Sequence, residues 1–99
     1  MNNTKTIGDV IRRDERRDEF NLYIYELAVR LGTDTANFRL PLYSLRITMT
    51  DAYGNTREEC VRDVFADSAR AIKFYEKLVC GLATPIDLPY VLEDERAIG

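Results

Sequence analysis

The feature that most constrains the fold is a segment, Phe20 to Leu31, that is apolar on two sides over its first half. It is rich in aromatic and β-branched residues, which favours a β-strand, and successive side chains of a strand point to opposite faces of the sheet. One face of this strand would carry Tyr23, Tyr25, Leu27, Val29 and Leu31, and the other Leu22, Ile24, Glu26, Ala28 and Arg30. We therefore expect the strand to lie in the middle of a sheet or against a partner.

A second strand and a hairpin follow in the sequence. Residues 42–50 alternate between apolar and polar side chains, which predicts a strand with one buried face. Residues 51–55 include Gly54, which tolerates a positive φ angle, so they predict a turn. The charge-rich residues 56–64 then predict a returning strand at an exposed edge of the sheet.

Helical patterns occupy the rest of the chain. An amphipathic helix is expected to run to about Cys80, with Asp67 or Ser68 as its N-cap and Gly81 as its stop. Its continuous apolar arc is typical of a helix laid on a sheet. Asp87 can cap a second, short helix, because the first turn of a helix tolerates a proline such as the one at position 89.

These elements predict an α+β fold. We expect an antiparallel sheet of three to four strands, with one main helix packed on one face and a short C-terminal helix. A chain of 99 residues buries only roughly 60–70% of its unfolded surface, which leaves room for one core. The sequence is therefore divided into a polar N-terminal arm (1–19), a single α+β domain (20–95) and a frayed tail (96–99).

The N-terminal arm contains the most unusual segment, Arg12 to Glu19, in which Arg-Arg-Asp-Glu occurs twice. Before it, Ile7, Val10 and Ile11 have the spacing of one face of a short helix. In a helix, every pair of charges four residues apart in the repeat would be alike, although opposite charges three apart would offset part of that cost. Such a helix could pair with its own copy through an acidic and a basic stripe. The alternative interpretation is a solvated connector.

Most of the machinery of catalysis is missing from the sequence. Without histidine, the chain has no Ser-His-Asp or Cys-His pair, no usual general base and few ways to bind zinc. It also has no CxxC motif, phosphate-binding loop or nucleophile elbow. We therefore predict no catalytic residue, no cofactor and no metal site, and we interpret the protein as not being an enzyme.

Charge and hydropathy limit the partners and the location. The net charge is −3 and the pI is about 4.9, so no global positive field attracts nucleic acid. No apolar run approaches the roughly 20 residues that span a bilayer, and the polar N-terminus does not predict a signal peptide. We expect a cytoplasmic protein without membrane contact, in which Cys60 and Cys80 are free thiols.

The first candidate surface is the sheet face that the main helix leaves uncovered. Depending on the side that the helix takes, this face carries Leu22 and Ile24 or Tyr23 and Tyr25. A small sheet with one helix leaves that face short of cover. Our first hypothesis is a non-enzymatic protein–protein interaction module that forms a homodimer through this face or through a strand edge. The identity of any other protein partner stays open.

The second candidate surface is the arginine segment. An accessory or regulatory protein could contact nucleic acid through Arg12, Arg13, Arg16 and Arg17, with tyrosines as stacking surfaces. The four carboxylates among these arginines would repel each approaching phosphate. Together with the acidic pI, this makes nucleic acid the less favoured partner.

Three segments resemble a known group of proteins: 43–47, 61–64 and 84–94. The last matches a Pro-Ile-x-Leu-x-x-Val-x-Glu-Asp tail, through Pro85, Ile86, Leu88, Glu93 and Asp94, with Val91 and Leu92 at its apolar positions. Over about residues 20–95 the chain is similar to short bacterial proteins of unknown function, of the Firmicutes type. The resemblance implies a cytoplasmic bacterial protein, and it supplies no activity, ligand or catalytic residue.

Overall fold

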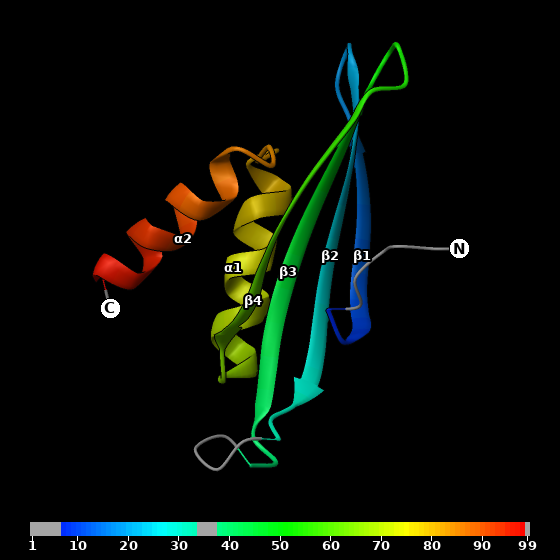
Figure 1. Ribbon diagram of the computed structural model, residues 1–99. Coiled ribbons are helices and arrows are strands. Elements are labelled where there is room, and N and C mark those ends of the chain that lie inside the picture. The colour runs from blue at the N-terminus through cyan, green and yellow to red at the C-terminus, as the bar shows by residue number, and fades with distance from the viewer. Residues whose placement is uncertain (1–6, 34–37, 99) are drawn as a thin grey trace.

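The computed structural model describes residues 7–33 and 38–98. Its elements follow one another as β1 (Asp9–Arg17), β2 (Asn21–Leu31), β3 (Pro41–Asp51), β4 (Thr56–Phe65), α1 (Ser68–Cys80) and α2 (Asp87–Ile98). The strands form one antiparallel sheet in the order β1-β2-β3-β4, and both helices lie on the same side of it (Figure 1). The predicted α+β fold is therefore confirmed, with four strands. Neither helix is long and apolar enough to cross a membrane.

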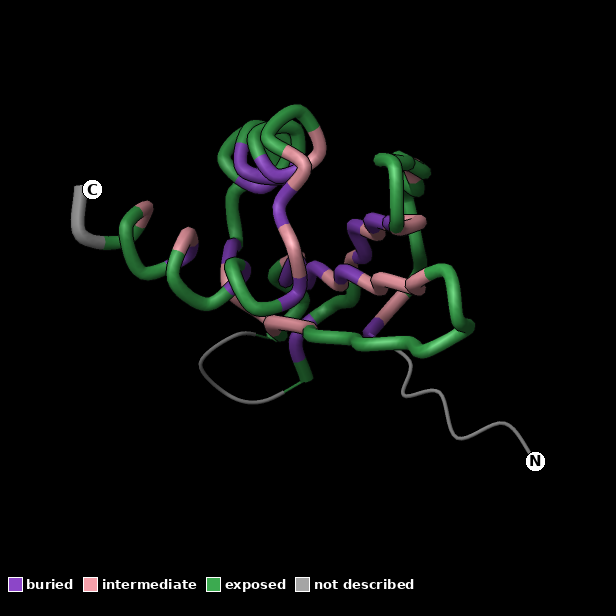
Figure 2. The backbone as a smooth tube through the Cα atoms, turned by 90° about the horizontal axis from the view of Figure 1, so that it is seen from above, coloured by how far each residue is buried: buried purple, intermediate pink, exposed green. Residues whose placement is uncertain are grey.

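The interior position of β2 confirms the expectation from its doubly apolar sequence. β2 pairs with β3 along its whole length, from Asn21 opposite Asp51 to Leu31 opposite Pro41, and its other side pairs with β1. Seen from above, buried positions gather between the sheet and α1 (Figure 2). The core there includes residues from β2, β3 and both helices, among them Tyr25, Leu27, Leu45, Ile47, Phe74, Tyr75, Leu78 and Leu88.

The predicted hairpin of β3 and β4 is also confirmed. The Asp51 carboxylate accepts hydrogen bonds from the backbone amides of Tyr53 and Asn55, each at 2.9 Å, and Gly54 takes a φ angle of 87°. β4 is an edge strand, as expected. It contains an irregularity near its end, where the amide of Asp63 (φ 55°) donates to the Ser44 hydroxyl at 2.9 Å.

Both helices begin where the sequence indicated. Asp67 caps α1 by accepting from the amide of Ala69 at 3.0 Å, and the amide of Gly81 closes the last turn on the Lys77 carbonyl. Gly81 itself has an ordinary φ of −85°, whereas the left-handed conformation falls on Leu82, with a φ of 53°.

The C-terminal helix differs from the expectation in its length. α2 continues to Ile98, so residues 96–98, which the sequence assigned to a frayed tail, are part of this helix, and Gly99 lies outside the described residues. Leu88 and Leu92 are buried and attach the first turns of the helix to the core. Its later turns lead away from the sheet (Figure 1).

The largest correction concerns the predicted N-terminal arm. Residues 9–17 are neither a helix nor a connector but strand β1, so the sheet begins well before Phe20. Residues two apart share one face of a strand, and there the repeat places opposite charges side by side. Arg12 lies 3.5 Å from Asp14, and Arg13 lies 2.9 Å from Glu15. Residues 1–6 of the arm lie outside the described residues.

Candidate functional site: the uncovered sheet face

The helices decide which of the two predicted sets of interface residues is accessible. Tyr23 and Tyr25 face the helices and are only 4% and 1% exposed. The Tyr25 hydroxyl donates to the carbonyl of Ala83 at 2.8 Å, in the segment that joins α1 to α2. These two tyrosines are therefore core residues. The candidate interface narrows to Leu22 and Ile24, which lie on the opposite face and are half-buried.

The accessible part of this face lies at the end near the two hairpin turns. Its centre, which we call the open patch, consists of Leu22, Ile24, Thr48 and Thr50, all half-buried. The neighbouring positions of the edge strands border it: Arg13, Glu15 and Arg17 from β1, and Thr56, Glu58 and Cys60 from β4. Towards the other end the same face is closed, because Ala28, Leu42 and Ser44 are all buried.

An ion pair separates the open patch from the closed end of the face. The Arg46 guanidinium donates to the Glu26 carboxylate at 2.7 Å, and the two side chains are only 11% and 14% exposed. This hydrogen bond raises the pKa of Arg46 further. Because both charges already have a partner, covering this region would not leave an unpaired buried charge, which is the costly situation.

A shallow hollow of about 350 Å³ continues the open patch into the turns. Its wall consists of Arg17, Asp18, Glu19, Phe20, Asn21, Leu22, Thr50, Asp51 and Ala52. Phe20 is 67% exposed, and its place is set by Asp18, which accepts from the amides of Phe20 and Asn21 at 2.8 and 2.7 Å. Sequence reasoning missed Phe20 as a surface residue because it read the residue as the first of the strand.

Asp18 also forms a hydrogen bond with a core residue, Tyr23. The Tyr23 hydroxyl donates to Asp18 at 2.7 Å, and together with the two backbone amides this bond lowers the pKa of Asp18. The turn that presents Phe20 is therefore held by charge-assisted hydrogen bonds, which are stronger than neutral ones.

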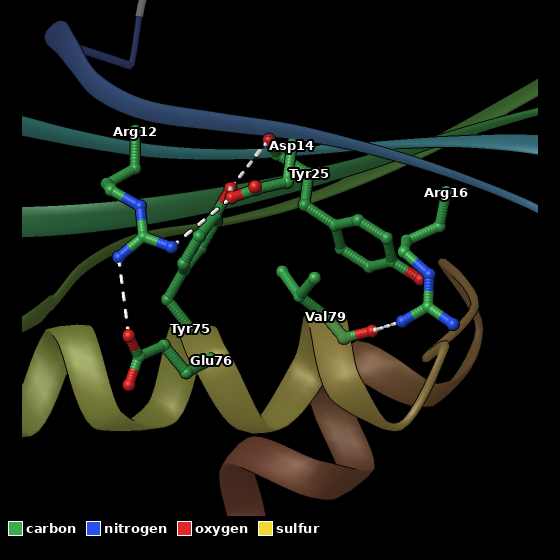
Figure 3. A network of polar contacts seen from close by, with 7 residues as sticks. All are labelled: Arg12, Asp14, Arg16, Tyr25, Tyr75, Glu76 and Val79. Atoms are coloured by element: carbon green, nitrogen blue, oxygen red, sulfur yellow. Dashed lines mark hydrogen bonds and ion pairs between the residues drawn. The ribbon is translucent and has the colours of Figure 1, made fainter.

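The four arginines proposed to contact nucleic acid do not form one patch. Arg12 and Arg16 point towards α1: Arg12 reaches Glu76 at 3.4 Å, and Arg16 donates to the carbonyl of Val79 at 2.7 Å (Figure 3). Arg13 and Arg17 belong to the opposite face. Each face therefore has two arginines with a carboxylate between them, which does not favour a phosphate backbone.

The polar cluster between β1 and α1 fastens the two layers together. The Tyr75 hydroxyl donates to Asp14 at 2.7 Å and lies 3.0 Å from the Tyr25 carbonyl oxygen, while the Arg12 guanidinium lies 5.1 Å above the Tyr75 ring (Figure 3). Burial raises the pKa of Tyr75 above its ordinary value, and burial also raises the pKa of Tyr25, to about 12. Both hydroxyls act as hydrogen-bond donors.

Metal ligands do not gather anywhere in the described ranges. No group of three or more Cys, Asp or Glu side chains in residues 7–33 and 38–98 is placed to hold a metal ion. The described thiols, Cys60 and Cys80, are free, as expected.

Together, the fold and this face define a class: a small α+β protein in which two helices cover one side of a four-stranded antiparallel meander and leave part of the other open. The chain belongs to DUF6514, a family of unknown function, whose model matches residues 4–97. Searches of curated proteins and of solved structures found no significant match. Membership of this family fits the resemblance seen in the sequence, and it assigns no activity.

Proposed function

We propose that the protein is a non-enzymatic interaction module that binds a second copy of itself through the open patch. The observation that supports this most is the pair of half-buried aliphatic side chains, Leu22 and Ile24, on the sheet face opposite the helices. Phe20, largely exposed, lies beside them in the same hollow. An apolar centre with a charged border is the usual composition of a protein–protein interface.

The size of the surface supports a weak dimer rather than a permanent one. Along β2, the surface from Phe20 to the Glu26–Arg46 pair is about seven residues long, at roughly 3.4 Å each. Across the sheet it covers four strands at about 4.8 Å spacing, so its area is on the order of 450 Å² per copy. Two copies would bury about twice that, which is within the range of weak, transient complexes. A symmetric dimer would use the same patch on both copies, which is the commonest arrangement in homo-oligomers.

Charges on the border are compatible with such a pairing. The β1 side of the open patch has Arg13 and Arg17 around Glu15, and the β4 side has Glu58. Positively and negatively charged side chains are thus both available for contacts with a second copy. The Glu26–Arg46 pair at the edge of the patch is already satisfied and adds no unpaired charge.

Sedimentation velocity over a range of protein concentrations tests the proposal. We expect a reversible monomer–dimer equilibrium in the wild type and a monomer for Ile24→Arg, because a cation in the open patch would have to be buried on association. Ile72→Arg is the matched control, since Ile72 is exposed on α1, on the other side of the sheet. A wild-type mass that stays monomeric at every concentration would contradict the proposal.

We further propose that the protein works in the cytoplasm of a bacterium. The support is the resemblance to short bacterial proteins and the presence of Cys60 and Cys80 as free thiols, which suit a reducing compartment. Cell fractionation with an antibody against the protein tests the location. Recovery in a secreted fraction would contradict it.

A further inference from the structure

We infer that the doubled Arg-Arg-Asp-Glu unit disfavours pairing of β1 with the β1 strand of a second copy in the registers that overlap the repeat most fully. β1 is an edge strand with β2 as its neighbour in the sheet, so its outer side presents backbone groups to any extended chain. Edge strands of this kind are the usual route to unwanted sheet extension. This inference goes beyond the proposed function and does not depend on it.

The geometry of sheet pairing sets the rule. Residues directly opposite each other in neighbouring strands have their side chains on the same face. When two identical chains join β1 to β1 in antiparallel fashion, they are related by a two-fold axis perpendicular to the sheet. Their helices therefore lie on the same side of the joined sheet. Helix-facing residues of one copy then lie opposite helix-facing residues of the other copy. Residues of the open face likewise lie opposite residues of the open face.

The repeat makes the two faces conflict in this arrangement. Charges alternate along each face of β1, as Arg12, Asp14, Arg16 on the helix side and Arg13, Glu15, Arg17 on the other. The charge pattern on the second face is the same as on the first face but is shifted by one residue along the strand. A register that places opposite charges across from one another on one face therefore places like charges across from one another on the other face.

One register illustrates the conflict. If the two-fold axis passes through residue 15, Asp14 faces Arg16 of the second copy, which is favourable. On the other face, however, Arg13 faces Arg17 and Glu15 faces its own copy. Moving the axis to residue 14 exchanges the two faces and leaves the same balance.

Parallel pairing of two β1 strands gives no better result. It places the helices of the two copies on opposite sides, so helix-facing residues meet residues of the other face. With charges in the order of this repeat, opposite and like pairs then alternate along the strand. In these parallel registers, and in the antiparallel ones centred on residues 14 and 15, about half of the charge pairs repel. Cross-strand pairs of like and opposite charge have effects of similar size and opposite sign. The charges of the repeat therefore add no net attraction that would offset the cost of association.

Disulfide trapping can test this inference directly. In a Cys60→Ser, Cys80→Ser background, Glu15→Cys places one thiol on the axis of the register described above. Opposed residues of antiparallel strands have Cα atoms about 4.5–5.5 Å apart, which a disulfide can bridge. Four proteins are compared: this parent, Arg13→Glu, Arg17→Glu and the double reversal. Both positions are exposed, so folding is expected to be retained, and thermal unfolding verifies it.

The expected result is a non-monotonic pattern in the rate of dimer formation by disulfide. Either single reversal turns the Arg13–Arg17 contacts into attractive pairs and should accelerate cross-linking about tenfold at low salt. The double reversal restores like charges and should return the rate to that of the parent. The acceleration should shrink near 1 M salt, where the screening length falls to about 3 Å.

Net charge alone cannot produce that pattern, because the double reversal changes the net charge most. Equal rates in all four proteins, or rates that follow net charge, would overturn the inference. The open patch is unchanged in the four proteins, so the sedimentation result for Ile24→Arg remains a separate test of the proposed function.

Discussion

The two faces of the sheet are made from the same strands but are closed in different ways. On the helix side, Tyr25, Leu27 and Ile47 are at most 1% exposed, and the polar groups at the border are bonded to α1. On the other side the open patch stays half-exposed, and the Glu26–Arg46 pair joins two strands of the same sheet. One face therefore holds the layers together, whereas part of the other stays accessible to solvent.

Truncating one leucine on each face should give the largest contrast. Leu27→Ala removes a side chain that is 0% exposed under the helices and should cost about 2–5 kcal/mol of unfolding free energy. Leu22→Ala removes a half-buried side chain and should cost only about 1 kcal/mol. Urea unfolding at low protein concentration measures both. Equal losses would show that the two faces do not differ in packing.

Removing the hydroxyl of Tyr75 should weaken the connection between β1 and α1. Tyr75→Phe leaves the ring in place and deletes the bond to Asp14, at an expected cost of about 1–2 kcal/mol. Tyr53→Phe is the control, because Tyr53 is 91% exposed and its change should stay within about 0.5 kcal/mol. A Tyr75→Phe protein as stable as the wild type would mean that the polar cluster does not fasten the layers.

The alkaline titration of Tyr25 should change folding only above pH 10. Its pKa is raised to about 12 in the folded chain, against an ordinary value of 10.0. The unfolded chain loses this proton first, so the contribution to stability is complete below pH 10 and is lost as the pH rises through about 12. Phenolate absorbance of the wild type minus that of Tyr25→Phe measures the transition. A transition near pH 10 would contradict the burial of this hydroxyl.

Local patterns predicted much of the fold from the sequence. The apolar alternation in β2 and β3, the turn around Gly54 and the cap at Asp67 each depend on residues close together in the chain. The sequence did not determine which face the helix takes, because that depends on contacts such as the Tyr75–Asp14 bond, whose partners are 61 positions apart. The candidate site therefore remained a choice between two pairs of residues.

β1 was missed for a different reason. The helical interpretation rests on spacings of three and four, and at four every charge pair of the repeat is alike. It leaves out the spacing of two that describes a strand. At that spacing each charge has an opposite neighbour, as in the Arg13–Glu15 pair. A conflict in the helical pattern was thus itself an indication of a strand.

The alternating charges on the helix side of β1 also bear on how the chain finds its register while folding. A strand with few apolar residues gains little from hydrophobic matching, so a slip of two residues along β2 keeps every side chain on its proper face. Here, such a slip would bring the Asp14 or Asp18 carboxylate, instead of the Arg16 guanidinium, to the Val79 carbonyl oxygen. The slip that brings Asp18 to this position would also set Asp14 against Glu76 in place of Arg12. The contacts with α1 thus favour the native register of the β1–β2 hairpin, although α1 begins more than 50 residues after the end of β1.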